Sequence, residues 1–167
     1  MKKLILFCSI ATVLLISCSA PTETELTEEQ KAAIVAEVES QYDGLVSTIN
    51  EIDIDAWTEY WSEENFISVN SLITYFPSYT EWIDNVTYYF STRESQDVQI
   101  VGVNTTVFSS DLVLLTSITN WNLIDTSGVQ INDSKTLASL LWKKGTSGWK
   151  AIYLHESWVP DENEQAP

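Results

Sequence analysis

Four long runs of β-forming residues in the C-terminal half of the chain limit the folds that it can adopt. They span residues 96–108, 111–125, 129–144 and 149–158, are rich in Val, Ile, Thr and Trp, and are separated by short segments of Ser, Thr and Gly. Consecutive strands joined by turns this short must pair antiparallel. Because twist accumulates along such long strands, the sheet must curl. The pattern therefore predicts a curved four-stranded meander.

Three helical patterns precede these runs. The first begins at Thr27 and Gln30, which have the spacing of a capping box, and apolar residues then recur at steps of three and four. Either Asp53 or Asp55 can cap a second, shorter helix, and Ser78 opens a third. A curled sheet that wraps its concave face around helices encloses a cone. We therefore expect an α+β domain in which a curved antiparallel sheet surrounds N-terminal helices.

The N-terminus has the pattern of an export signal. Lys2 and Lys3 are followed by an apolar run of about a dozen residues, which is too short for a membrane span. The run closes on a Leu-Ile-Ser-Cys sequence that ends at Cys18 and resembles the lipobox of bacterial lipoproteins. That resemblance implies that residues 1–17 are removed and that Cys18 becomes a lipidated first residue, anchored to a membrane of the bacterial cell envelope. The alternative is a plain secretory signal in which Cys18 is incidental.

The chain then divides into three parts. Residues 18–26 comprise the lipidated cysteine and a tether rich in Pro, Thr and Glu, residues 27–160 form the cone domain, and residues 161–167 form an acidic tail. Ser19 stands where an aspartate, in the lipoproteins that the chain resembles, often signals retention in the inner membrane. This favours the outer membrane as the destination.

Composition excludes several classes of function. Removal of the signal takes away Cys8, and lipidation would block Cys18, so the mature chain has no thiol for a disulfide or a zinc site. Without the two lysines of the signal, 24 acidic residues face 6 basic ones, a formal charge of −18 that repels nucleic-acid backbones. Asp53 and Asp55 imitate the start of a calcium loop, but Trp57 occupies the position of the next ligand. We therefore expect no metal, no cofactor and no nucleic-acid partner.

The order of the elements and the last hairpin carry a resemblance to a known superfamily. Two helices, a short strand over residues 66–69, a third helix and a four-stranded meander resemble the nuclear transport factor 2-like superfamily, in particular its SnoaL-like branch. The final hairpin is similar to that of SnoaL-like domains and of the kinase association domain, where a Trp, a His six residues on and a Ser two further close the last strand; here these are Trp149, His155 and Ser157. The resemblance implies a cystatin-like cone. Tyr153 replaces a second histidine that those domains often carry.

Side chains of the last strand alternate between two faces. One set is Trp149, Ala151, Tyr153, His155 and Ser157, and the other is Lys150, Ile152, Leu154, Glu156 and Trp158. Because the first set contains the residues shared with the superfamily, we assign it to the concave face that the helices cover. The second set would then face outward, where exposure of Ile152, Leu154 and Trp158 to water would cost free energy. Members of the superfamily often dimerise through their sheets, so we expect a homodimer.

His155 is the only histidine in the chain and the first candidate for chemistry. An unperturbed pKa of about 6.5 suits proton transfer near neutral pH, so His155 is a candidate general base in the cone pocket. A hydroxyl of Tyr60 or Tyr153 could stabilise an enolate, and Asp55 or Glu59 could orient the imidazole. The alternative is a structural histidine that is hydrogen-bonded to a helix.

Aromatic residues form the second candidate site. Trp57, Trp61, Trp82, Trp121 and Trp142, together with Ser157, are predicted to line a ligand-binding pocket for a small apolar or sugar-like molecule. The alternative is that these rings only build the core, because aromatic residues at helical spacing often do.

Three classes of function remain open. We favour a membrane-anchored, non-catalytic module that binds a small ligand or a protein, because a fold does not fix a function and the acid-base groups are few. The alternative is an enzyme of the isomerase, cyclase or dehydratase kind that uses His155 as general base. A structural lipoprotein is the third class. An open cavity lined by His155 would favour the enzyme, whereas a cavity plugged by Trp57, Trp61 and Trp142 would argue against it.

Overall fold

The structure, a computed structural model, describes residues 25–71 and 73–159, so Cys18, the signal segment and the acidic tail lie outside the described residues. Within these residues, three helices and six strands follow one another: α1 (Glu28–Asn50), α2 (Ile54–Thr58), β1 (Ser68–Ser71), β2 (Thr74–Phe76), α3 (Tyr79–Ser91), β3 (Arg93–Ser109), β4 (Leu112–Asp125), β5 (Gln130–Gly145) and β6 (Gly148–Val159). Among the described residues, no helix is long and apolar enough to cross a membrane.

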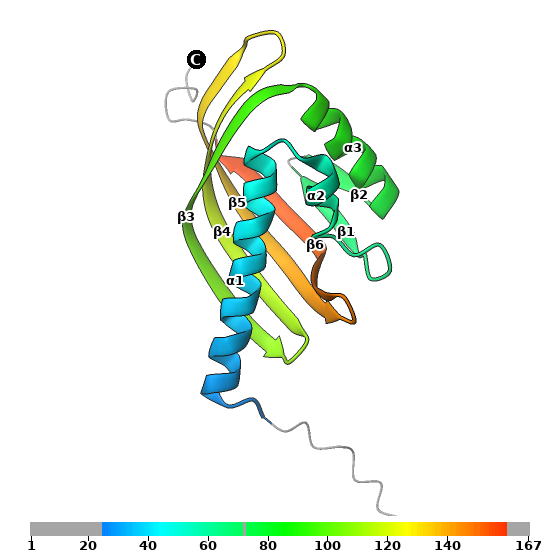
Figure 1. Cartoon of the computed structure of the whole chain (residues 1–167), viewed down its shortest axis with the longest axis vertical. Coiled ribbons are helices and arrows are strands. Elements are labelled where there is room, and N and C mark those ends of the chain that lie inside the picture. Colours follow the sequence, from blue (N-terminus) through cyan, green and yellow to red (C-terminus); the bar gives the residue numbers. More distant parts are fainter. Residues whose placement is uncertain (1–24, 72, 160–167) are drawn as a thin grey trace, which may run out of the picture.

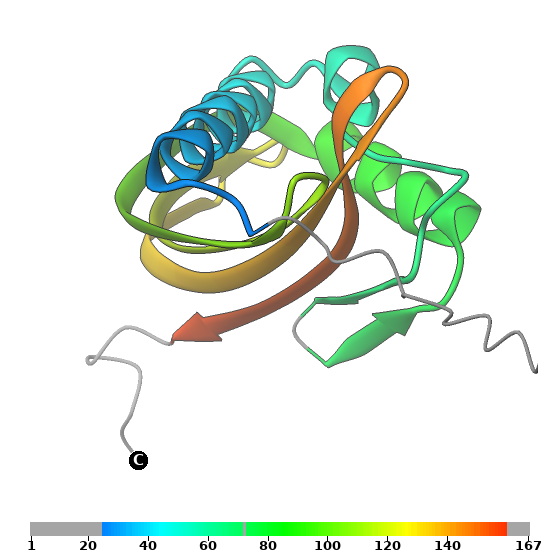
Figure 2. The ribbon, with the colours of Figure 1, turned by 90° about the horizontal axis from the view of Figure 1, so that it is seen from below.

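One curved sheet contains all six strands, in the order β2-β1-β6-β5-β4-β3. The predicted meander is confirmed, since β3 to β6 pair antiparallel with their neighbours in sequence. The sheet curls around the helices without closing, which gives the predicted α+β cone (Figures 1 and 2). The sequence predicted one short strand before the third helix, whereas the structure has a hairpin, β1–β2, that extends the sheet beyond β6 by parallel pairing.

Polar contacts of three α1 residues, Glu39, Tyr42 and Asn50, fix the helix to the concave face of the sheet. Near its middle, Thr105 donates to Glu39 at 2.8 Å, and the hydroxyls of Tyr42 and Ser117 form a hydrogen bond of 2.7 Å. At its C-terminal end, the Asn50 amide accepts from the Val98 backbone N–H at 2.7 Å and donates to the Val98 carbonyl at 3.1 Å. These contacts set the position of the helix over the sheet.

Helix ends agree with the capping patterns in the sequence. The Gln30 N–H donates to the Thr27 hydroxyl at 3.2 Å, while the Thr27 N–H donates to the Gln30 side chain at 2.9 Å. Of the two candidate caps of α2, Asp53 is the one used, accepting from the Ala56 N–H at 2.9 Å. Ser78 caps α3 by accepting from the Glu81 N–H. The local signals therefore predicted where the helices begin.

A β-bulge in β6 changes which residues face the helices. Leu141 of β5 pairs with Tyr153, but the next residue, Trp142, pairs with Ala151, so Ile152 is an extra residue in β6. Beyond the bulge the alternation is reversed. Leu154, Glu156 and Trp158 point to the concave face, and Tyr153, His155 and Ser157 lie on the convex one. The predicted assignment of the two sets beyond Ala151 was therefore wrong, because simple alternation cannot anticipate an inserted residue.

Candidate ligand-binding site

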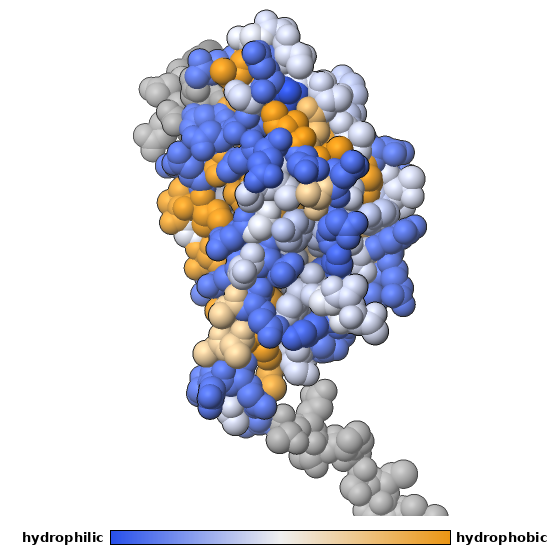
Figure 3. Space-filling model, in the orientation of Figure 1, coloured by the Kyte–Doolittle hydropathy of each residue, from blue (hydrophilic) through white to orange (hydrophobic). Residues whose placement is uncertain are grey.

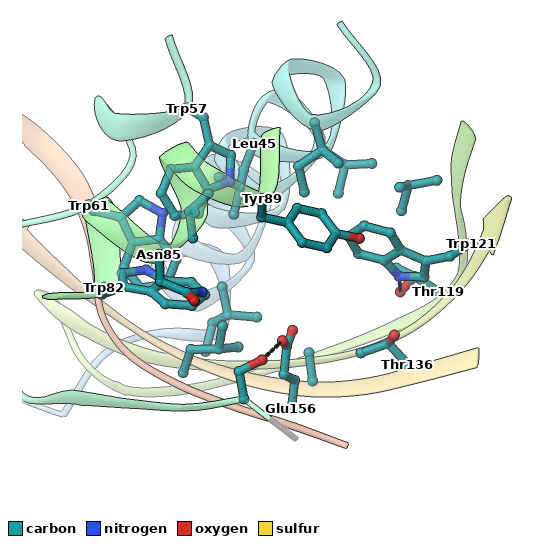
Figure 4. A pocket seen from close by; sticks show the side chains of 18 of the residues that line it. Leu45, Trp57, Trp61, Trp82, Asn85, Tyr89, Thr119, Trp121, Thr136 and Glu156 are labelled. Atoms are coloured by element: carbon teal, nitrogen blue, oxygen red, sulfur yellow. Dashed lines mark hydrogen bonds between the residues drawn. The ribbon is translucent and has the colours of Figure 1, made fainter. Parts of the chain in front are cut away.

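A cavity of about 290 Å³ lies between the helices and the concave face of the sheet. Its wall combines residues of α1, α2, α3 and the β1–β2 hairpin with inward-facing residues of β3 to β6. Figure 4 shows that Trp57, Trp61 and Trp82 gather at one end and that Thr119, Thr136 and Trp121 lie at the other, with Glu156 between them. The cavity thus has an aromatic end and a polar end.

The aromatic end is closed by tryptophans that pack against one another. Ring centroids are 5.2 Å apart for Trp57 and Trp61, 5.6 Å for Trp61 and Trp82, and 5.8 Å for Trp57 and Trp82. All three side chains are buried, and Phe76 and Phe90 extend the cluster. Contacts this close leave no room for a ligand between the rings, so a ligand can meet only their outer surfaces.

Glu156 is the carboxyl that faces the cavity. The Ser71 hydroxyl, delivered by the parallel pairing of β1 with β6, donates to one carboxylate oxygen. Apolar neighbours surround the group, with Ala138 directly across on β5 and Leu154 beside it on β6. This burial raises the pKa of Glu156, against the smaller lowering effects of the Ser71 hydrogen bond and the charge of His155. The site therefore holds an acid that gives up its proton less readily than an exposed glutamate does.

Two tyrosines also line the cavity. Burial raises the pKa of Tyr42 to about 12, and its hydroxyl is held by Ser117. Burial also raises the pKa of Tyr89, and the Arg93 guanidinium lies 3.8 Å above the Tyr89 ring centroid. Both phenols therefore stay neutral at ordinary pH and can act only as hydrogen-bonding groups.

The structure removes His155 from the cone. Its side chain is exposed on the convex face, opposite Ser139, and lies with Ser157 in a shallow groove. Tyr153 belongs to the same outward-facing set. Asp55 lies in α2 and Glu59 directly follows that helix, on the concave side of the sheet, so neither can orient His155 from there. The predicted general base in the pocket was therefore misplaced, together with the predicted pocket residue Ser157, and the bulge at Ile152 is the cause.

Tyr60 does not line the cavity either. Its hydroxyl lies against Gly44 of α1 so closely that any larger residue at position 44 would meet it. Its backbone carbonyl accepts from the Ala151 N–H at 2.7 Å, which ties the segment after α2 to β6. The contacts of Tyr60 therefore point to a structural role, and they explain why a glycine occupies the middle of a long helix.

The predicted pocket tryptophans divide into two groups. Trp57, Trp61, Trp82 and Trp121 lie in the cavity wall, whereas Trp142 is fully buried in the core and does not line the cavity. The sequence reasoning missed Glu156, Thr136 and Trp158 as cavity residues. Glu156 carried one usable signal, because it is a charged residue inside a strand that is otherwise largely apolar.

Comparison with solved structures identifies the fold. A nuclear transport factor 2-like superfamily protein from Salmonella enterica superposes with a TM-score of 0.71 at 11% identity, covering 82% of this chain and 99% of that one. The chain has the nuclear transport factor 2-like fold. A candidate dehydratase of that family from Streptomyces avermitilis superposes with a TM-score of 0.69 at 16% identity, covering 78% of this chain and 99% of that one. The association domain of C. elegans CaMKII superposes with a TM-score of 0.61 at 15% identity, covering 78% of this chain and 99% of that one.

Sequence comparisons add no closer assignment. No family model matches the chain, and no curated protein matches it. The described residues contain no group of three or more His, Cys, Asp or Glu side chains that could hold a metal ion. What the cavity of this nuclear transport factor 2-like fold can bind or catalyse must therefore be inferred from the residues that line it.

Glu156 gives the stability of the domain a pH dependence of defined sign. Because the pKa of its carboxyl is raised above the ordinary value of 4.5, the folded chain keeps a proton that the unfolded chain releases. The free energy of unfolding should therefore fall as the pH rises above that value toward the raised pKa, by at most about 1.4 kcal/mol per pH unit. The substitution Glu156→Gln should flatten this slope, which urea unfolding at a series of pH values measures.

Other shifted carboxyls act in a different pH range. Hydrogen bonds from Lys144 and Trp149 lower the pKa of Glu37, so its contribution to stability is lost only as the pH falls. Glu64→Gln, at an exposed position, is the matched control and should keep the slope of the parent protein. Equal slopes for the parent and Glu156→Gln would contradict the assigned protonation of Glu156.

Proposed function

We propose that the domain binds a small, largely apolar ligand inside the cone. The observation that carries this proposal is the cavity of about 290 Å³, whose wall is mostly aliphatic and aromatic; among the described residues that line it, Glu156 supplies the one carboxyl. Its volume is close to the lower limit of about 300 Å³ for small-molecule sites. The packed tryptophans at one end would select the shape of the ligand, and the polar groups at the other end would fix its orientation.

A proton-transfer enzyme is the second candidate. Glu156 favours it, because a carboxyl in an apolar cavity can act as an acid or base near neutral pH. The similar protein from Streptomyces avermitilis is described as a candidate dehydratase of the same fold, which supports chemistry of this kind in the cone. In this candidate Glu156 takes the part that the sequence had assigned to His155, and Glu156→Gln would still bind ligand but lose turnover.

Ligand binding in the cone is tested by filling the cavity. Ala138 faces Glu156 inside the cone, whereas the next residue, Ser139, pairs with His155 on the convex face. Ala138→Phe should lower the affinity for N-phenyl-1-naphthylamine, an uncharged fluorophore that brightens in apolar surroundings, at least about tenfold because the added ring occupies the cavity. Ser139→Phe adds the same ring outside and should bind like the parent. Equal binding by both variants, or none by the parent, would contradict the proposal.

We propose further that the domain works at a membrane surface in the bacterial envelope, with Cys18 as its lipidated first residue. The lipobox-like sequence supports this, and multiple acyl chains would anchor the domain stably. Mass spectrometry of the protein expressed with its signal should find a lipid-modified N-terminal Cys18, and Cys18→Ala should move the protein from the membrane to the soluble fraction. An unmodified, soluble parent protein would refute the anchor.

The convex face of the sheet supports a homodimer. Ile118 and Leu137, which pair across β4 and β5, are 40% and 46% exposed and border the groove that contains His155. Apolar side chains also gather along the β3 edge of the molecule (Figure 3), where Val101 is 58% exposed. An exposed apolar surface of this kind favours association, and a kinase association domain shares the fold.

The dimer is tested by a charge on the convex face. Leu137→Lys would bury an unpaired cation at the proposed interface and should turn a dimer into a monomer in multi-angle light scattering at micromolar concentration. Ile73→Lys, at a fully exposed position in the β1–β2 turn, is the matched control and should leave the mass unchanged. A monomeric parent protein would refute the proposed dimer.

A further inference from the structure

Two residues that are neighbours across adjacent strands each carry a buried polar atom at the polar end of the cavity. Thr136 and Trp158 pair directly across β5 and β6, and both side chains line the cavity. The Thr136 hydroxyl oxygen and the Trp158 indole nitrogen are buried and have no hydrogen-bond partner among the described residues. Figure 4 shows the Thr136 side chain on the same side of the cavity as Glu156, which precedes Trp158 by two residues on β6.

In the described cavity wall the indoles of Trp61 and Trp82 and the hydroxyl of Tyr89 also lack a partner. Thr136 and Trp158 differ from these in pairing directly across adjacent strands. The Trp121 indole N–H, also at the polar end, donates to the Thr119 hydroxyl at 2.8 Å. Trp121 packs against Trp158 with ring centroids 5.5 Å apart. The same residue types on adjacent strands thus satisfy one indole and leave the other with no partner in the described part of the chain. Since a buried donor without a partner costs free energy, the unpaired donors indicate where a ligand would bind.

The chemistry of these groups defines the polarity of that ligand. An indole N–H can only donate, and a threonine hydroxyl beside it can donate as well. Donors on two neighbouring residues of the cavity wall suit a ligand with an acceptor, such as a carbonyl oxygen. The described cavity wall contains no Lys or Arg to balance an anion. A cation would need an ionised Glu156, whereas burial favours the neutral acid.

We propose, on the basis of the function proposed above, that the cone selects an uncharged, largely apolar molecule whose accepting oxygen, a carbonyl being the strongest case, binds between the Thr136 hydroxyl and the Trp158 indole. The apolar body of the ligand then lies toward the tryptophan end. Thr136 and Trp158 are specificity residues in this arrangement, because they distinguish an acceptor from a hydrocarbon of the same shape.

A series of ligands with one skeleton tests the inference. Tetralin, 1-tetralone, 1-aminotetralin and tetralin-1-carboxylate differ only in the polar group and compete with N-phenyl-1-naphthylamine for the cavity. The ketone should bind about tenfold more tightly than tetralin, which corresponds to about 1.4 kcal/mol. The amine and the carboxylate should bind no more tightly than tetralin.

Conservative variants separate recognition from folding. Thr136→Val keeps the shape of the side chain and removes its hydroxyl, so the ketone should bind no better than tetralin while the affinity for tetralin is unchanged. Trp158→Phe should act in the same way by removing the indole N–H. Thr136→Ser retains a hydroxyl and should retain the preference for the ketone. Thr136→Val also removes a buried polar group without a partner and should raise the melting temperature of the free protein, which shows that the variant folds.

The possible outcomes distinguish this inference from the proposed function. Equal affinities of the parent protein for tetralin and the ketone would overturn the acceptor site and leave ligand binding in the cone intact. Tightest binding of the amine would overturn it in favour of a cationic ligand at Glu156, and tightest binding of the carboxylate would overturn it in favour of an anionic one. Failure of every compound to displace the fluorophore would overturn the proposed function as well.

Discussion

A single extra residue in β6 decides which chemistry faces the cone. Without the bulge at Ile152, strict alternation would continue from Trp149 and would point His155 at the helices and Glu156 outward. With it, the acid faces the cavity and the imidazole faces solvent. Ile152 is itself buried, so the inserted side chain packs inside the protein instead of being expelled from it. The cavity, the groove on the convex face and the choice of candidate site residues all depend on this register.

The limits of sequence reasoning follow from the same feature. Helix starts were predictable because capping is local: Thr27, Asp53 and Ser78 are each read from a few neighbouring residues. The meander was predictable because short turns leave antiparallel pairing as the available arrangement. The hairpin β1–β2 was not, because its strands are very short and one of them pairs with a strand more than eighty residues away. The face of the sheet on which His155 lies could not be predicted either, because packing between strands decides where a bulge forms.

The aromatic residues serve both of the roles that the sequence left open. Trp142 is core, while Trp57, Trp61 and Trp82 form a packed wall whose surface borders the cavity. The packed cluster closes one end of the cone, and hydrogen bonds between α1 and the sheet position the helix over the rest of the cavity.

The two open edges of the sheet have consequences for how the molecule meets copies of itself. A free strand edge invites another chain to add to the sheet and so to aggregate. Here one edge is β2, which is only three residues long, and the other is β3, a strand of 17 residues whose pairing with β4 is interrupted at three places. A short edge and a repeatedly kinked edge are both poor templates for strand addition. Crowding such domains together should therefore favour contacts between sheet faces over fibre-like growth through the edges.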